Sequence, residues 1–243
     1  MLIAPHNSSV ESLICTNLQT VQSQIALAAA TAHRTVESIT VIAVSKGHAA
    51  HSLRAAAACG VRHFGESYVQ EALPKMQSLH DLPLTWHFIG RLQANKSRLI
   101  AESFDWVHAV DRARIAERLS QQRPHYARPL QVCIQVNIAG EAGKAGVEPT
   151  AAVQLALAVQ QLPRLRLRGL TCILPADRSA DDNRRAFRDL RLLSEQINAR
   201  AGAGLDTLSM GMSADFREAI GEGATLLRIG TAIFGPRQRS SPE

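Results

Sequence analysis

Lys46 is the residue whose position in this sequence most directly suggests chemistry. It closes the apolar run of residues 39–45 (ITVIAVS), which is short, rich in β-branched residues and free of charge, as a buried strand would be. Burial disfavours the charged form of an amine, and a neutral amine can attack a carbonyl carbon. The structural alternative is a lysine that lays its alkyl chain along a strand end and keeps its charge in water. The segments that follow favour the chemical interpretation.

Two glycine-containing segments late in the chain predict an anion site. One follows a predicted strand at residues 207–210, the other a predicted strand at 226–229. Serine and threonine hydroxyls can donate hydrogen bonds, glycines let the backbone approach a ligand, and a helix expected from near Ala214 would point its amides at the same place. Two ordinary glycine turns are the alternative, yet barrels often hold a phosphate between the loops after their seventh and eighth strands. The residues concerned are Ser209, Met210, Gly211, Ser213, Gly230 and Thr231.

Arg228 and His87 are two further candidates on predicted strands. A core-facing arginine needs a partner, and Arg228 precedes the second glycine segment, so its guanidinium is expected to face a ring nitrogen of a bound cofactor. The alternative is an outward-facing arginine in an ion pair. His87 is followed by Ile89-Gly90, which places it near a strand end; a histidine hydrogen-bonded in the core is its alternative.

The elements that must position these residues alternate regularly. A helix is expected at residues 10–34. Strands are expected at 39–46, 61–65, 84–90, 106–110, 130–138, 167–174, 207–210 and 226–229. Helices are expected at 50–59, 68–79, 94–102, from an N-cap at Asp111 to 122, and at 149–161, 181–201 and 215–221.

Eight strands separated by seven helices predict an α/β fold, a single (β/α)8 barrel of the TIM type with an extra N-terminal helix. The alternative is a doubly wound sheet, but no Gly-x-Gly-x-x-Gly turn follows any strand. We expect a helical segment at 1–35 packed on the barrel, the barrel itself at 36–236 and a frayed tail at 237–243.

Composition limits the classes of partner. The net charge of +6 suits either nucleic acid or a phosphorylated small ligand as a partner. Only four of the 27 basic residues are lysines, so a lysine at any one position is uncommon in this chain. Aromatic residues make up 4% of the chain, too few to stack on bases, and the basic segment 162–168 falls at the far end of a strand, where a solvated rim is expected. We therefore predict no nucleic-acid partner.

Neither a membrane nor a metal is expected. The sequence has no signal peptide and no apolar run near the ~18 residues of a membrane span, so we predict a cytoplasmic protein. His48 and His51 are three residues apart, but no third ligand accompanies them. The cysteines form no Cys-x-x-Cys pair and are interpreted mainly as small buried residues in a reducing compartment; they are Cys15, Cys59, Cys133 and Cys172.

Taken together, these segments resemble the pyridoxal phosphate homeostasis protein family. The matching segments are AVSK (43–46), FGESYVQE (64–71), WHFIG (86–90), LQANK (92–96), VNI (136–138), SMGMS (209–213) and RIGTAIFG (228–235). The resemblance implies a barrel like the N-terminal domain of alanine racemase, with pyridoxal 5′-phosphate (PLP) held as a Schiff base on Lys46. It also implies phosphate contacts from Ser209, Ser213, Gly230 and Thr231, and Arg228 at the pyridine nitrogen.

We add Ser67, His87, Met210 and Gly211 to the expected cofactor-binding set because they lie in the matching segments. The sequence departs from the family pattern at Ser67, Arg91, Ala94, Ala214 and residues 47–49 (GHA). Of these departures, Ser67 and His48 are expected to change how the carboxyl end of the barrel binds the cofactor. Whether Lys144 forms a second PLP site stays open.

The resemblance leaves a choice between a carrier and an enzyme. An arginine has no proton to give the pyridine nitrogen, so the ring should be a weak electron sink. Racemases with this arginine add a tyrosine from a second domain, and the only tyrosines here, Tyr68 and Tyr126, do not follow the barrel. We therefore predict a monomeric, non-catalytic protein that buffers PLP or delivers it to apo-enzymes, with an alanine-racemase-type enzyme as the alternative.

Overall fold

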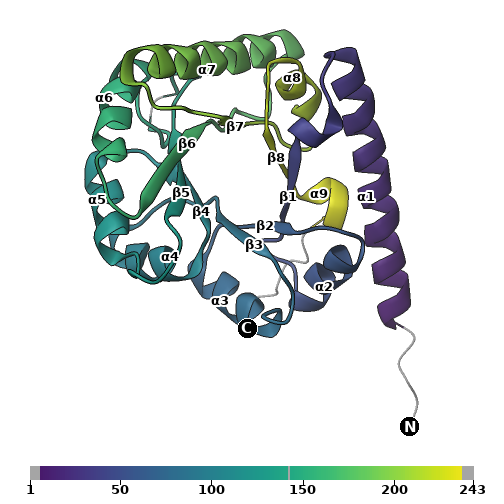
Figure 1. Ribbon diagram of the computed structural model, residues 1–243. Coiled ribbons are helices and arrows are strands. Elements are labelled where there is room, and N and C mark those ends of the chain that lie inside the picture. Colours follow the sequence, from purple (N-terminus) through teal and green to yellow (C-terminus); the bar gives the residue numbers. More distant parts are fainter. Residues whose placement is uncertain (1–5, 142, 237–243) are drawn as a thin grey trace.

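Eight parallel strands close into a barrel surrounded by helices (Figure 1). This arrangement belongs to the computed structural model of the protein, which describes residues 6–141 and 143–236. Each strand pairs with the next along the chain, and β8 pairs with β1 to close the ring. The predicted barrel with an extra N-terminal helix is confirmed; the expected tail at 237–243 lies outside the described residues.

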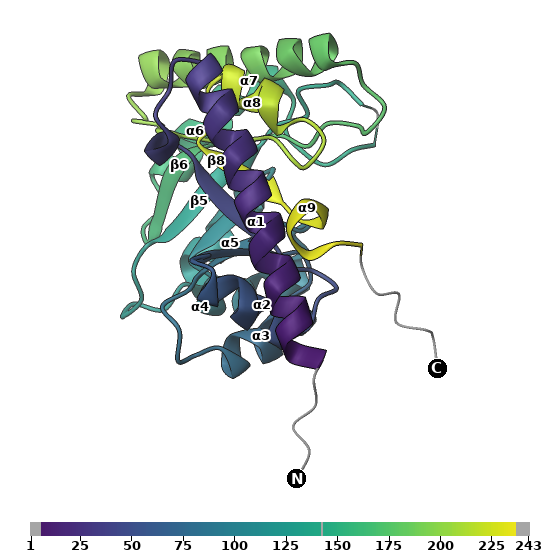
Figure 2. The same cartoon turned by 90° about the vertical axis from the view of Figure 1, so that its right-hand side faces the viewer.

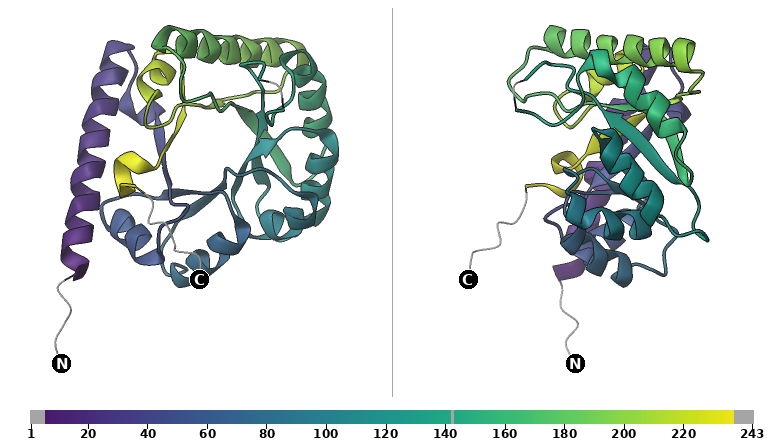
Figure 3. Two further views of the ribbon diagram at one scale, coloured as in Figure 1. Left: turned by 180° about the vertical axis from the view of Figure 1, so that it is seen from behind. Right: turned by 90° about the vertical axis from the view of Figure 1, so that its left-hand side faces the viewer.

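The strands are β1 (Thr40–Val44), β2 (His63–Glu66), β3 (Thr85–Phe88), β4 (Trp106–Val110), β5 (Leu130–Gln135), β6 (Leu165–Thr171), β7 (Thr207–Ser209) and β8 (Leu226–Ile229). The α-helices are α1 (His6–Thr31), α2 (Ala50–Ala58), α3 (Val69–Ser78), α4 (Ser97–Ser103), α5 (Ala113–Gln122), α6 (Pro149–Gln160), α7 (Ala180–Ala201), α8 (Phe216–Gly221) and α9 (Thr231–Phe234). Short 3-10 turns, η1 (Val36–Ser38) and η2 (Ala94–Lys96), precede β1 and α4. Helices surround the barrel in the front view and in the view from behind (Figure 3).

The long helix α1 lies outside the barrel and covers the region where the ring closes (Figure 2). Its buried side chains recur every three or four residues and so form one apolar stripe: Ile14, Leu18, Val21, Ile25 and Ala29. The Asn17 amide donates to the Ile233 carbonyl of α9 at 3.0 Å, which ties the end of the barrel to this helix.

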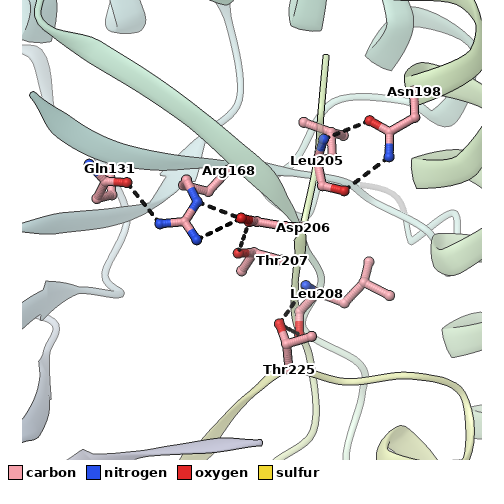
Figure 4. Close-up of polar contacts among 8 residues, drawn as sticks. All are labelled: Gln131, Arg168, Asn198, Leu205, Asp206, Thr207, Leu208 and Thr225. Atoms are coloured by element: carbon pink, nitrogen blue, oxygen red, sulfur yellow. Dashed lines mark hydrogen bonds and ion pairs between the residues drawn. The ribbon is translucent and has the colours of Figure 1, made fainter. Parts of the chain in front are cut away.

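Polar side chains from β5, from β6 and from the segment before β7 contact one another at the amino-terminal end of the barrel (Figure 4). The Arg168 guanidinium donates twice to the Asp206 carboxylate, at 2.9 and 2.8 Å, and once to Gln131 at 3.0 Å. It also lies over the Trp106 ring at 5.0 Å. The register between β5 and β6 shifts at this point and leaves Arg168 without a paired residue, as in a β-bulge. The Arg168 side chain is 25% exposed and that of Asp206 is 50% exposed, so this part of the predicted solvated rim is only partly covered, by Trp106.

Three local predictions are also wrong. Asp111 does not cap α5: the N-cap is Arg112, with no side-chain cap, and Asp111 accepts from the Arg112 guanidinium instead. The segment after β8 forms the short helix α9, where none was expected. Cys15 of α1 and Cys59 at the end of α2 form a disulfide, because α1 packs on α2 and brings their Cα atoms to 5.6 Å. Cys133 and Cys172 are free and buried, as predicted.

Candidate functional site

Lys46 lies at the carboxyl end of β1, at the mouth of the barrel. Its side chain is half-buried and follows the interior-facing residues Ile42 and Val44 at the two-residue period of a strand. Gly47 comes next with φ of 76°, a left-handed conformation that favours glycine and turns the chain away from the mouth. Lys46 therefore lies just beyond the end of β1 and lines a cavity at this end of the barrel.

Arg228 lies on the neighbouring strand, deeper in the same mouth. It pairs with Ile42 in the register of β8 with β1, four residues before Lys46 in the sequence. The guanidinium donates to Thr171 at 3.1 Å, to the Ser209 hydroxyl at 2.7 Å and to the Cys172 carbonyl at 2.7 Å. The prediction of a core-facing Arg228 is confirmed.

Every acceptor that Arg228 reaches is neutral. The side chain is 5% exposed, and the ion pairs found among the described residues leave it without a carboxylate partner. Burial lowers the pKa of this guanidinium, and the smaller effects of Cys172 and Asp215 act in the opposite direction. A buried cation with no counter-ion is costly, so the mouth favours a ligand that is electron-rich or anionic.

Three histidines form a hydrogen-bonded chain inside the barrel that leads to Arg228. His63 contacts His87 through ring nitrogens 2.9 Å apart, His87 contacts His108 at 3.0 Å, and the His108 Nδ1 lies 2.9 Å from the Ser209 hydroxyl. Neutral rings satisfy this chain if Ser209 donates to His108, His108 to His87 and His87 to His63, while Ser209 accepts from Arg228. The chain therefore fixes the Ser209 hydroxyl and, through it, the guanidinium.

The inner histidines are held in the neutral form. Burial lowers the pKa of His87 well below its usual range, helped by the nearby His108 and His63. Burial also lowers the pKa of His108 to about 3, and the charge of Arg228 acts in the same direction. Two imidazolium ions beside a buried guanidinium would be strongly unfavourable. Arg228 is accordingly the positive charge of this part of the interior.

The two glycine segments lie side by side on β7 and β8. Gly211, with φ of 93°, accepts from the Arg228 amide at 3.0 Å, and an added Cβ there would meet Ala219 at 2.7 Å. Asp215 accepts from the Met212 amide at 2.6 Å and so holds the turn after β7. Ser213 is half-buried and Thr231 is exposed, so both hydroxyls stand near the surface of the mouth.

Other predicted residues are placed differently. The side chain of Ser209 is fully buried and occupied by His108 and Arg228, and Met210 is fully buried as well. His87 lies in the interior, not at the mouth surface, because it is the third residue of β3 and faces the barrel axis. Gly230 is half-buried, and its backbone lies next to Val44 of β1.

A cavity of about 340 Å³ opens beside Lys46 on the side of β2 and β3. Its lining includes Ser67, Tyr68, Arg91 and Lys96, of which Ser67 was predicted. Gly90 is required there because a Cβ would meet the Ser67 carbonyl oxygen at 2.1 Å. A larger cavity of about 490 Å³ lies against α1 and α8, and none of the predicted site residues lines it.

His48, another departure from the family pattern, stacks on Phe234 of α9 with ring centroids 4.9 Å apart. Within residues 6–141 and 143–236, no group of three acidic, histidine or cysteine side chains could hold a metal ion. None of the helices described is long and apolar enough to span a membrane.

Sequence reasoning missed His63, His108, Thr171 and Cys172. The signal for the histidines was available, since His63, His87 and His108 lie on three consecutive predicted strands or at their margins. Which of them face inward, and how their rings meet, depends on the register between strands. That register is a property of the closed barrel, not of any one segment.

Comparison with known proteins agrees with this geometry. Residues 16–238 match the family described as "Alanine racemase, N-terminal domain". An alanine racemase from Corynebacterium glutamicum shares the fold, with a TM-score of 0.69 at 17% identity, and this chain covers 63% of that chain. The fold and mouth thus define a barrel of the alanine racemase N-terminal class.

More similar proteins narrow this class. The "Pyridoxal phosphate homeostasis protein" of Pseudomonas aeruginosa is 52% identical over 231 residues, which are 95% of this chain and 99% of the relative. Its counterpart in Escherichia coli K12 is 48% identical over 235 residues, 93% of this chain and 98% of the relative. PipY of Synechococcus elongatus PCC7942, solved with PLP bound, has a TM-score of 0.82 at 39% identity, covering 91% of this chain and 100% of PipY. This chain belongs to the family of pyridoxal phosphate homeostasis proteins.

Proposed function

We propose that this protein binds PLP at the carboxyl end of the barrel, holds it as a Schiff base on Lys46, and buffers it or passes it to other proteins. The observation that carries the proposal is the placement of two groups at one end of the barrel: the amine of Lys46 just after β1, and Arg228, a buried cation without a carboxylate partner, on the neighbouring β8. The amine adds to the aldehyde carbon and one water leaves as the C=N bond forms, so no oxidant or reductant is needed.

The residues present fit the cofactor. Lys46 supplies the amine, and Arg228 supplies N–H donors for the pyridine nitrogen. Ser213, Thr231 and the backbone at Gly211 and Gly230 supply the phosphate contacts. Three further residues of the proposed site act from below, because their side chains are buried beneath the mouth and support it: His87, Ser209 and Met210. Ser67 contributes from the cavity beside Lys46.

We expect the phosphate to contribute much of the affinity. Pyridoxal, which lacks the phosphate, should bind far more weakly than PLP in an absorbance titration. Thr231→Ala should weaken PLP binding by about 1 kcal/mol, roughly fivefold, because one exposed hydroxyl donor to a dianion is lost. Thr225→Ala removes a threonine hydroxyl that bonds to Leu208 away from the mouth and serves as the control. Equal affinities for pyridoxal and PLP would contradict a phosphate site here.

The rival function is that of a racemase-type enzyme. Arg228 has no proton to give a pyridine nitrogen, so electron withdrawal through the ring would be weak. The names of the relatives also support homeostasis over racemisation.

Loaded protein should therefore give PLP to an apo-enzyme without turning over free amino acids. Incubation with L-alanine in D2O, followed by NMR, should show negligible deuteration at the α-carbon. Exchange at an enzyme-like rate of about 1–1000 per second would establish the rival function.

Recipient proteins, the monomeric state and a cytoplasmic location belong to the same proposal. The Cys15–Cys59 disulfide is the one observation that argues against a cytoplasmic location, since disulfides are rare in a reducing cytoplasm. Lys144 is no part of the proposed site: its side chain is 65% exposed and lies 3.7 Å from Glu141.

A further inference from the structure

A buried cluster of charges lies behind Lys46, between β1, β2 and α3. Lys75 of α3 donates to Glu66 of β2 at 2.7 Å and to Glu71, one helical turn earlier, at 2.6 Å. The Ser45 hydroxyl donates to the same Glu66 oxygen at 2.6 Å. The side chains of Glu66 and Lys75 are 0% and 7% exposed, whereas that of Glu71 is 30% exposed. Nothing in the proposed binding of PLP uses this cluster.

The cluster holds the backbone on both sides of Lys46. Lys75 donates to the Ser45 carbonyl at 2.8 Å, and that carbonyl belongs to the peptide group that precedes Lys46. Glu71 accepts from the Gly47 amide, which belongs to the peptide group that follows Lys46. The orientation of these two peptide groups defines φ and ψ of Lys46, and hence the direction of its Cα–Cβ bond.

Ordinary strand pairing does not provide this control. β1 ends at Val44, and its last ladder-type bond is from the Ser45 amide to the Gly65 carbonyl at 3.0 Å. Gly47, with φ of 76°, is a residue type with wide backbone freedom. Lys46 thus lies just after the end of a strand, in a turn closed by the His48 amide, which donates to the Ser45 carbonyl at 3.1 Å. The two bonds from α3 restrict this turn further.

We propose that Glu71 and Lys75 are positioning residues for Lys46, a clamp from α3 that aims its amine into the mouth. The proposal rests on the proposed attachment of PLP to Lys46. Such positioning matters because a displacement of about 1 Å at a reacting atom can lower reactivity by up to ~100-fold. The i,i+4 pairing of Glu71 with Lys75 keeps the two bonds of the clamp in a fixed relation.

Glu71 is the residue to change, because it is partly exposed and its loss leaves Lys75 paired with Glu66. Changing Lys75 to Met would instead leave the Glu66 carboxylate buried without a cation. One oxygen of that carboxylate, Oε2, already has no hydrogen-bond partner. Glu71→Leu removes the acceptor for the Gly47 amide, while Glu71→Gln keeps an acceptor oxygen. Glu195→Leu, in the exposed i,i+4 pair with Arg191 on α7, is the matched control.

Two ligands separate positioning from general damage to the site. Pyridoxine 5′-phosphate has an alcohol where PLP has its aldehyde, so it tests the mouth without bonding to Lys46. Glu71→Leu should weaken PLP binding by about 10- to 100-fold and change pyridoxine 5′-phosphate binding less than about twofold. Glu71→Gln should fall between this variant and wild type, and Glu195→Leu should match wild type. Equal losses for both ligands, or no loss for either, would overturn the clamp.

Amide hydrogen exchange gives a readout that needs no ligand. The Gly47 amide should exchange faster in Glu71→Leu and keep its protection in Glu71→Gln and Glu195→Leu. Unchanged protection in Glu71→Leu would refute the clamp whatever the ligands do. If wild-type protein binds PLP no better than pyridoxine 5′-phosphate, the attachment to Lys46 fails, and the clamp is then judged by the exchange of Gly47 alone.

Discussion

Lys46→Ala is expected to abolish the covalent binding of PLP. The wild-type protein should turn yellow on addition of PLP, because a C=N bond conjugated to the ring absorbs visible light, and the variant should stay colourless. Lys46 is half-buried at a strand end and lies outside the strand ladder, so the variant should keep its fold. Absorbance spectra recorded during a titration, beside circular dichroism spectra of both proteins, make the comparison.

The control for this experiment is Lys144→Ala, which removes the highly exposed lysine of the β5–α6 connection. It should load like wild type. A Lys46→Ala protein that still develops the same colour would mean that another amine carries the cofactor. A colourless Lys144→Ala protein would move the site to that connection.

The second large effect concerns pH. The pKa of His87 and His108 is lowered in the folded protein, to about 3 for His108, mainly by burial. Such groups stabilise the fold above their unfolded pKa, near 6.5, and this stability is lost as the pH falls towards the folded value. Below about pH 6.5, each neutral histidine should lower the free energy of unfolding by about 1.4 kcal/mol per pH unit.

Glu66 and Asp215 act in the opposite direction, because burial raises their pKa in the folded state. A difference between variants therefore isolates the histidine contribution. The free energy of unfolding should be measured with denaturant at pH 7.5, 6.5 and 5.5. Below about pH 6.5 it should fall less steeply with pH for His108→Asn than for wild type, by the slope that corresponds to about one proton. His51→Gln, an exposed position on α2, should retain the wild-type slope. Identical slopes for wild type and His108→Asn would show that the buried chain does not resist protonation.

Much of the fold was predictable from the sequence because strands and helices alternate with clear periodicity. The bounds of β4 and β8 match the prediction, and the others differ at one or both ends, where hydrogen bonding and not apolar pattern decides the limit. The barrel rule that sites form at the carboxyl ends of strands also predicted Lys46 and Arg228 on neighbouring strands of one barrel, where the structure has β1 and β8 paired.

The remaining features depend on contacts between segments that no local pattern reveals. The interior chain of His63, His87 and His108 requires the registers of β2, β3 and β4. The clamp requires α3 to lie across the end of β1, and the Cys15–Cys59 bond requires α1 to pack on α2. These features arise from tertiary packing.

Reduction with borohydride tests the central claim most directly. Borohydride converts the C=N bond of the PLP-loaded protein into a stable amine, and peptide mapping by mass spectrometry then locates the attached group. The account predicts one pyridoxyl group per chain, on the peptide that contains Lys46. A group on the peptide of Lys75, Lys96 or Lys144, or no stable attachment, would contradict it.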